Sequence, residues 1–71
     1  MTEPVIIYSE DEIEVGDLIK FNNGRIVLLI KYTHCDGIGG NTFTAKYKNE
    51  SYIYTIATLF RWIRDGTAKL Y

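Results

Sequence analysis

The chain has 71 residues, of which 46% are hydrophobic and 24% charged, and its formal net charge is −1. A chain of this length holds one core and buries only about 60% of the surface of its unfolded state, which excludes a second domain. The composition is that of an ordinary globular domain and argues against disorder throughout. The longest apolar run, Ile26 to Ile30, is far too short to cross a bilayer.

Cys35 is the single cysteine and cannot form an internal disulfide. Small secreted domains usually compensate for a small core with paired cysteines. The N-terminal stretch has neither the basic residues nor the long apolar run of a secretory signal peptide. We therefore expect a cytoplasmic protein with no membrane partner.

Charge is divided unevenly along the chain. Residues 1–17 carry six acidic side chains and no basic one, whereas residues 18–71 carry eight basic and three acidic side chains. Such a split indicates an electrostatic partner surface or an internal shield. We divide the single predicted domain, residues 1–71, into an acidic leader (1–12) and a body (13–71).

The leader begins with "PVIIY" (4–8), which predicts a short strand with Pro4 at its start or at a sheet edge. The acidic stretch "SEDEIE" (9–14) is either a loop or a short helix with Ser9 as N-cap and Glu12 in the capping-box position. A Gly-Asp turn at 16–17 then leads into the body.

Residues 17–33 predict a β-hairpin. The Asn23-Gly24 pair lies between two apolar runs and favours a type I′ turn, because both residues tolerate positive φ. The second arm, 26–32, is apolar at every position except Lys31. A strand that is apolar on both faces is usually central and covered on both sides, so this arm predicts a second layer or a closed barrel.

Residues 41–55 predict a second hairpin with its turn at 48–50. The apolar period then changes to i, i+3, i+4, i+7 in "TIATLFRWIRDG", which predicts an amphipathic helix over 55–65. Thr55 is the expected N-cap, and Gly66 is the expected glycine just after the last helical residue. Residues 67–71 can return as a last strand.

These elements predict a mainly β fold with one C-terminal helix, either a small SH3-like barrel or a curled sheet of five to six antiparallel strands. Residues 13–32 resemble the start of SH3-like barrels, in which a Gly-Asp turn leads into the first strand. The resemblance rests on Gly16, Asp17, Ile19, Phe21 and Gly24, and it implies a barrel fold. In general style, the short tyrosine-rich chain also resembles the small accessory proteins of tailed bacteriophages.

The stretch "THCDGIGGNTF" (33–43) holds the only histidine, the only cysteine and three of the six glycines. His34, Cys35 and Asp36 are too few and too closely spaced for a zinc site. Gly37, Gly39 and Gly40 could cradle a small anion or nucleotide through their amides, but their spacing fits neither common phosphate loop. Turn formation explains these glycines better. We predict no metal, no cofactor and no catalytic residue.

Three surfaces are candidates for binding. The second hairpin interleaves lysines and tyrosines, as in proteins that bind single-stranded nucleic acid: Lys46, Tyr47, Lys48, Tyr52 and Tyr54. The helix presents Trp62 between Arg61 and Arg64, the composition of a protein-binding hot spot. The leader presents Tyr8 beside Glu10, Asp11 and Glu12, which could steer a basic partner.

We therefore expect a non-enzymatic binding module, of the kind with which a phage modulates a host protein in the host cytoplasm. The alternative is a small barrel that binds single-stranded nucleic acid or a nucleotide through the tyrosine–lysine hairpin or the glycine loop. A homodimer is also expected, because small domains with exposed edge strands gain stability by pairing. Residues 5–8 and 68–71 are the expected edges.

Overall fold

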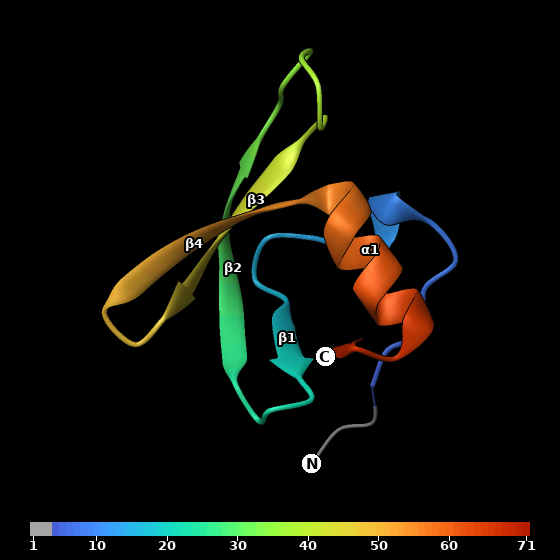
Figure 1. Cartoon of the computed structure of the whole chain (residues 1–71), viewed down its shortest axis with the longest axis vertical. Helices are drawn as coiled ribbons and strands as arrows, with labels where there is room; N and C mark the ends of the chain where they lie inside the picture. Colours follow the sequence, from blue (N-terminus) through green and yellow to red (C-terminus); the bar gives the residue numbers. More distant parts are fainter. Residues whose placement is uncertain (1–3) are drawn as a thin grey trace.

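A computed structural model describes residues 4–71 as one five-stranded antiparallel sheet with a helix on one face (Figure 1). The elements are η1 (Glu10–Glu12), β1 (Leu18–Phe21), β2 (Ile26–Thr33), β3 (Thr42–Tyr47), β4 (Glu50–Thr55), α1 (Ile56–Asp65) and β5 (Ala68–Leu70). The strand order is β4-β3-β2-β1-β5. The predicted fold class is thus confirmed, and the open sheet, not the closed barrel, is the architecture observed, because β4 and β5 lie at opposite edges.

The first hairpin forms as predicted, but its turn is not type I′. Gly24 has a φ of +89°, whereas Asn23 keeps a negative φ. The Gly24 amide donates to the Phe21 carbonyl (2.9 Å), and the Phe21 amide donates to the Arg25 carbonyl (2.8 Å). The chain therefore reverses over the three residues 22–24, and Gly24 alone supplies the left-handed conformation, as in three-residue hairpin loops.

β2 is buried on one face only, so the prediction of burial on both faces is wrong. Val27 and Leu29 are fully buried, but Ile26 and Leu28 keep 48% and 39% of their surface exposed. The physical reason is that the single ten-residue helix α1 packs on one face, and residues 4–71 provide no layer for the other. We call the helix-covered side the inner face and the uncovered side the outer face.

A β-bulge in β2 changes the face to which the side chains after it point. Leu29 pairs with Ala45 and Lys31 pairs with Thr44, so that Ile30 is an additional residue. The insertion shifts the alternation of side chains and brings Tyr32 opposite Phe43 on the inner face. The two rings meet edge to face with centroids 5.7 Å apart. The bulge thus adds one more ring to the inner face than strict alternation gives.

Helix α1 begins and ends where the sequence predicts. The Thr55 hydroxyl accepts a hydrogen bond from the Thr58 amide (3.3 Å), and Gly66 ends the helix in the left-handed conformation with φ +88°. Leu59 is fully buried against the sheet. The core residues with at most 5% exposure are Ile7, Ile13, Ile19, Val27, Leu29, Phe43, Ala45, Leu59, Ala68 and Leu70.

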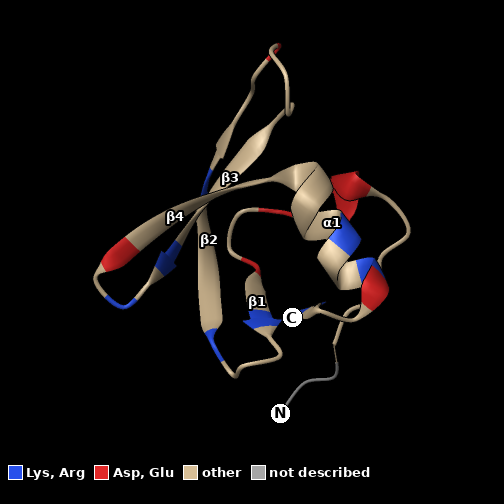
Figure 2. Cartoon of the chain, in the orientation of Figure 1, with Lys and Arg blue, Asp and Glu red and all other residues tan. Residues whose placement is uncertain are grey.

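The leader follows the prediction in part. Ser9 and Glu12 form the predicted capping box around η1. Residues 4–8 do not form a strand, which corrects the prediction; Val5 makes a single bridge to Leu70. Residues 4–8 nevertheless bury Ile7 in the core, which explains why this segment is apolar. Figure 2 shows the acidic residues of η1 beside α1 and the basic residues on β1 and the β3–β4 hairpin.

No helix within residues 4–71 is long and apolar enough to cross a membrane.

Candidate functional site: an aromatic groove

The β3–β4 hairpin reaches beyond the end of α1, so the helix leaves part of the inner face uncovered (Figure 1). Six side chains gather there, and together we call them the aromatic groove: Phe21, Arg25, Tyr47, Tyr52, Tyr54 and Trp62. A hollow of about 280 Å³ lies between the turn of the first hairpin and the helix, lined by Phe21, Arg25, Tyr54 and Trp62 with three polar neighbours. All six side chains are partly exposed.

Three rings form the floor of the groove. Trp62 meets Phe21 and Tyr54 edge to face, each with a centroid distance of 5.7 Å and an interplanar angle of 75°. Phe21 and Tyr54 lie 6.0 Å apart. Such aromatic pairs contribute about 0.5–1.5 kcal/mol each beyond the area they bury. The three rings therefore support one another, so the floor is pre-formed.

One wall of the groove is built from tyrosines and cations. Tyr52 stacks on Tyr54 with centroids 6.4 Å apart and planes inclined by 26°. The Arg25 guanidinium carbon lies 4.8 Å from the Tyr47 ring centre and 5.6 Å from that of Tyr52. The Lys48 ammonium lies 5.3 Å from the Tyr47 ring. These cation–π contacts orient the rings and place positive charge at the rim.

Strand register explains why these side chains meet. Tyr52 is paired with Ala45 and Tyr54 with Phe43, and both partners are core residues of the inner face. Ala45 is small, so it leaves room beside Tyr52. Phe21 is the last residue of β1, and Arg25 lies directly after the turn that follows it. The helix that starts at residue 56 then lays Trp62 across Phe21.

The Tyr52 hydroxyl donates a hydrogen bond to the Glu50 carboxylate. This hydrogen bond is the main cause that raises the pKa of Tyr52 above its ordinary value of 10.0, and partial desolvation and the negative charge of Glu50 add to it. Tyr52 therefore stays a neutral phenol, able to donate a hydrogen bond, at every pH at which the protein would work.

We expect an alkaline titration, followed by tyrosinate absorbance, to show that the pKa of Tyr52 lies above 10.0. Subtracting the titration curve of Tyr52→Phe from that of the wild type isolates the contribution of Tyr52. Glu50→Gln should lower this pKa, and Glu10→Gln should leave it unchanged. The pKa of Tyr52 is higher in the folded state than in the unfolded state. The Tyr52–Glu50 hydrogen bond therefore stabilises the fold fully below the unfolded-state pKa, and this contribution is lost as pH rises through the folded-state pKa. An unchanged curve in Glu50→Gln would contradict the assignment.

The structure joins two of the predicted surfaces and divides one of them. Tyr47, Tyr52 and Tyr54 of the hairpin meet Trp62 of the helix in one groove. Lys46 is paired with Leu28 and Ser51 and lies on the outer face, away from the tyrosines. The interleaved spacing of lysine and tyrosine in the sequence therefore does not become one mixed surface, because neighbours in a strand point to opposite faces.

The two arginines beside Trp62 do not line the groove. Arg61 is exposed. The Arg64 guanidinium donates to the Ile7 carbonyl (3.1 Å), so it fastens the leader to the helix. Arg61 and Arg64 also line a separate shallow surface with Phe60 and Asp65.

The acidic residues of η1 are exposed, and one of them, Glu12, has a structural role. Glu12 accepts hydrogen bonds from the amides of Tyr8 (2.6 Å) and Ser9 (2.9 Å) and closes the capping box. Glu10 and Asp11 are exposed, and Tyr8 keeps 77% of its surface exposed. Tyr8, Glu10 and Asp11 therefore remain available to a partner, whereas Glu12 is held by the fold.

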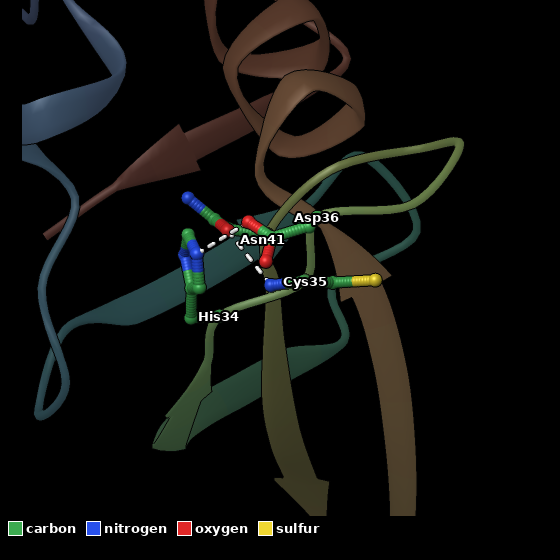
Figure 3. A network of polar contacts seen from close by, with 4 residues as sticks. All are labelled: His34, Cys35, Asp36 and Asn41. Carbon is green, nitrogen blue, oxygen red and sulfur yellow. Dashed lines mark hydrogen bonds and ion pairs between the residues drawn. The ribbon is translucent and has the colours of Figure 1, made fainter.

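The glycine loop between β2 and β3 is organised by its polar side chains (Figure 3). His34 Nε2 lies 2.8 Å from Asp36 Oδ1, and the Cys35 amide donates to Asn41 Oδ1 (3.0 Å). The Cys35 sulfur points away from the His34 ring. No group of three metal-binding side chains occurs among residues 4–71. The contacts are those of a turn that reverses the chain.

Gly39 and Gly40 have positive φ, +97° and +72°, and Gly37 does not. Gly39 and Gly40 border an open hollow of about 570 Å³ whose other side carries Glu10 and Asp11. Carboxylates at this position repel a phosphate, so the hollow is poorly suited to a nucleotide.

No family model, curated protein or solved structure matches this chain. The geometry of the groove is therefore the main guide to function. The sequence interpretation missed two of its six residues, Phe21 and Arg25. Their signal was available in principle: both lie within two residues of the predicted Asn23-Gly24 turn, and Phe21 ends the buried alternation of β1.

Proposed function

We propose that this chain is a small binding module that holds a segment of a partner polypeptide in the aromatic groove. The single observation that supports this proposal best is the convergence of five aromatic rings and Arg25 on one uncovered part of the sheet. Trp, Tyr and Arg are the residues that dominate the binding energy of protein interfaces. A pre-formed groove also loses little entropy on binding.

The charge of the groove favours a polypeptide over a nucleic acid. Arg25 is the one cation among the six groove residues, Lys48 adds a second at the rim, and Glu50 at the same end is an anion. Lys46, the other lysine of the β3–β4 hairpin, lies on the outer face. A nucleic-acid groove needs several cations along the path of the phosphates. The alternative of single-stranded nucleic acid is supported by the Tyr52–Tyr54 stack, on which a base could continue.

Trp62 is the only tryptophan, so its fluorescence reports on the groove directly. We expect a peptide selected on the immobilised chain from a random display library to change this fluorescence saturably, with an affinity that salt hardly alters. A short oligothymidylate should leave it unchanged. Saturable binding of oligothymidylate that weakens steeply with salt, with no peptide selected, would reject the proposal in favour of the alternative.

We place this function in the cytoplasm, in a host cell if the chain is encoded by a phage. The exposed free thiol of Cys35 supports a reducing compartment. The general style of small tailed-phage accessory proteins supports a modulator of a host protein. The partner proposed here is identified by its chemistry: an extended segment with apolar side chains and a carboxylate to meet Arg25.

A further inference from the structure

The two edges of the sheet are protected very differently. At one edge, β5 has three residues, and the Val5 amide donates to its Leu70 carbonyl (2.6 Å). At the other edge, β4 has six residues, ESYIYT, and within residues 4–71 it pairs with β3 alone. Proteins usually protect a free edge with lysine, proline, a bulge or a covering segment. β4 has none of these devices.

The ladder shows which backbone groups of β4 are unpaired. The Ile56 amide donates to the Asn41 carbonyl (2.9 Å), so residues 41 and 56 form a hydrogen-bonded pair. In an antiparallel ladder such pairs recur every second residue. Tyr54 and Tyr52 therefore point their amides toward β3, whereas Ser51 and Ile53 point theirs away from the sheet. Ile53 is also 71% exposed, a high value for an isoleucine in a strand.

From this edge we infer that β4 pairs with β4 of a second copy, antiparallel about a two-fold axis at Ile53. The exposed amides and carbonyls of Ile53 in the two copies then bond to one another, and the two isoleucine side chains meet on the outer face. This inference does not depend on the proposed function of the groove.

The register follows from the side chains. With the axis at Ile53, Ser51 lies opposite Thr55 of the partner subunit, and Tyr52 lies opposite Tyr54 of the partner subunit. Aromatic and β-branched cross-strand pairs of this kind are favourable. With the axis at Tyr52 instead, Ile53 would lie opposite a serine and stay half-exposed. Glu50 is the only charged residue of β4, and the two copies of Glu50 lie at opposite ends of the pairing, so they do not repel.

Pairing would join the two sheets into one of ten strands. Tyr52 and Tyr54 belong to the inner face, so the two aromatic grooves would lie on the same side of this sheet, next to the axis. A second copy fits the edge because the strand is self-complementary in this register. The other occupant to be distinguished is an extended peptide of a different protein, which would add to the same edge.

Cysteine cross-linking tests both the pairing and its register. In a Cys35→Ser background, Ile53→Cys puts two thiols on the axis, where paired Cα atoms are about 5.5 Å apart, a distance that suits a disulfide. Ser51→Cys is the matched control, because its two copies would lie about 13 Å apart, four residues along the strand. We expect the Ile53→Cys chain to form a disulfide-linked dimer on mild oxidation, and the Ser51→Cys chain to remain a monomer.

Wild-type protein provides a second measurement. We expect light scattering to give a dimer and amide exchange to show that the Ile53 amide is protected, with both signals lost in Ile53→Lys while circular dichroism is unchanged. Equal cross-linking of the Ile53→Cys and Ser51→Cys chains would overturn the inference. So would a wild-type monomer with a fast-exchanging Ile53 amide, a result that would leave the edge open to an extended peptide of a different protein.

Discussion

Replacing Leu29 with alanine should cost about 3 kcal/mol of unfolding free energy, within the range of about 2–5 kcal/mol for a buried leucine. Leu29 is fully buried between the sheet and the helix. Leu28 is the matched control, because it is the same residue type in the next position of the same strand but is 39% exposed on the outer face. Leu28→Ala should cost less than about 1 kcal/mol, as substitutions away from the core usually do.

Urea denaturation followed by circular dichroism measures both changes. Domains of this size have a total stability near 5 kcal/mol, so Leu29→Ala would leave little reserve. Thermal unfolding should show a decrease in midpoint of more than about 10 °C for Leu29→Ala, since each kcal/mol shifts a small domain by about 4–8 °C. Equal losses for the two variants would mean that both faces of β2 are covered, against the structure.

Replacing Trp62 with alanine should weaken binding of the selected peptide at least 30-fold, the equivalent of about 2 kcal/mol for a hot-spot residue. Trp62 contacts both Phe21 and Tyr54, so its loss empties the floor of the groove. Arg61→Ala is the control one residue away, exposed and outside the groove, and should change affinity less than twofold. Fluorescence anisotropy of a labelled peptide measures both variants, because it does not depend on the tryptophan.

Trp62 also packs against the core, so Trp62→Ala could weaken binding by destabilising the fold as well as by removing a contact with the peptide. These two effects must be separated. Tyr52→Ala provides the separation: Tyr52 lies at the end of the ring stack and is not among the residues that pack on the core. We expect Tyr52→Ala to reduce affinity about tenfold and to lower the unfolding midpoint much less than Trp62→Ala does. If Trp62→Ala weakens binding only as much as Arg61→Ala does, the groove is not the binding site.

The helix and the two hairpins could be predicted because their signals are local. The i, i+3, i+4 pattern of α1, the threonine before it and the glycine after it specify a helix with little help from the rest of the chain. The turns predicted at 23–24 and 48–50 likewise lie within one residue of the observed turns, 22–24 and 48–49. The capping box of η1 is also local, since Ser9 and Glu12 are three residues apart.

The errors came from non-local features. The apolar run of β2 predicts burial on both faces, but burial also needs a second layer, and a strand sequence does not show what will cover it. The strand predicted at 4–8 has the right composition, yet it meets β5 at one bridge only. Of the two expected edges, 68–71 is confirmed, because β5 lies at one edge of the sheet, whereas residues 5–8 only bridge to β5 through Val5. The free edge is β4, which sequence reasoning treated as one arm of a hairpin.

The sequence alone determined the type and place of the helix and the hairpin strands, because capping, turn conformation and apolar period act over a few neighbouring residues. Tertiary structure alone decided which side chains share a surface. It brought Phe21 and Arg25 to Trp62 and Tyr54, and it separated Lys46 from Tyr47, its neighbour in the chain. The physical reason is that strand order, register and helix position depend on distant pairings, and these assign each side chain to a face.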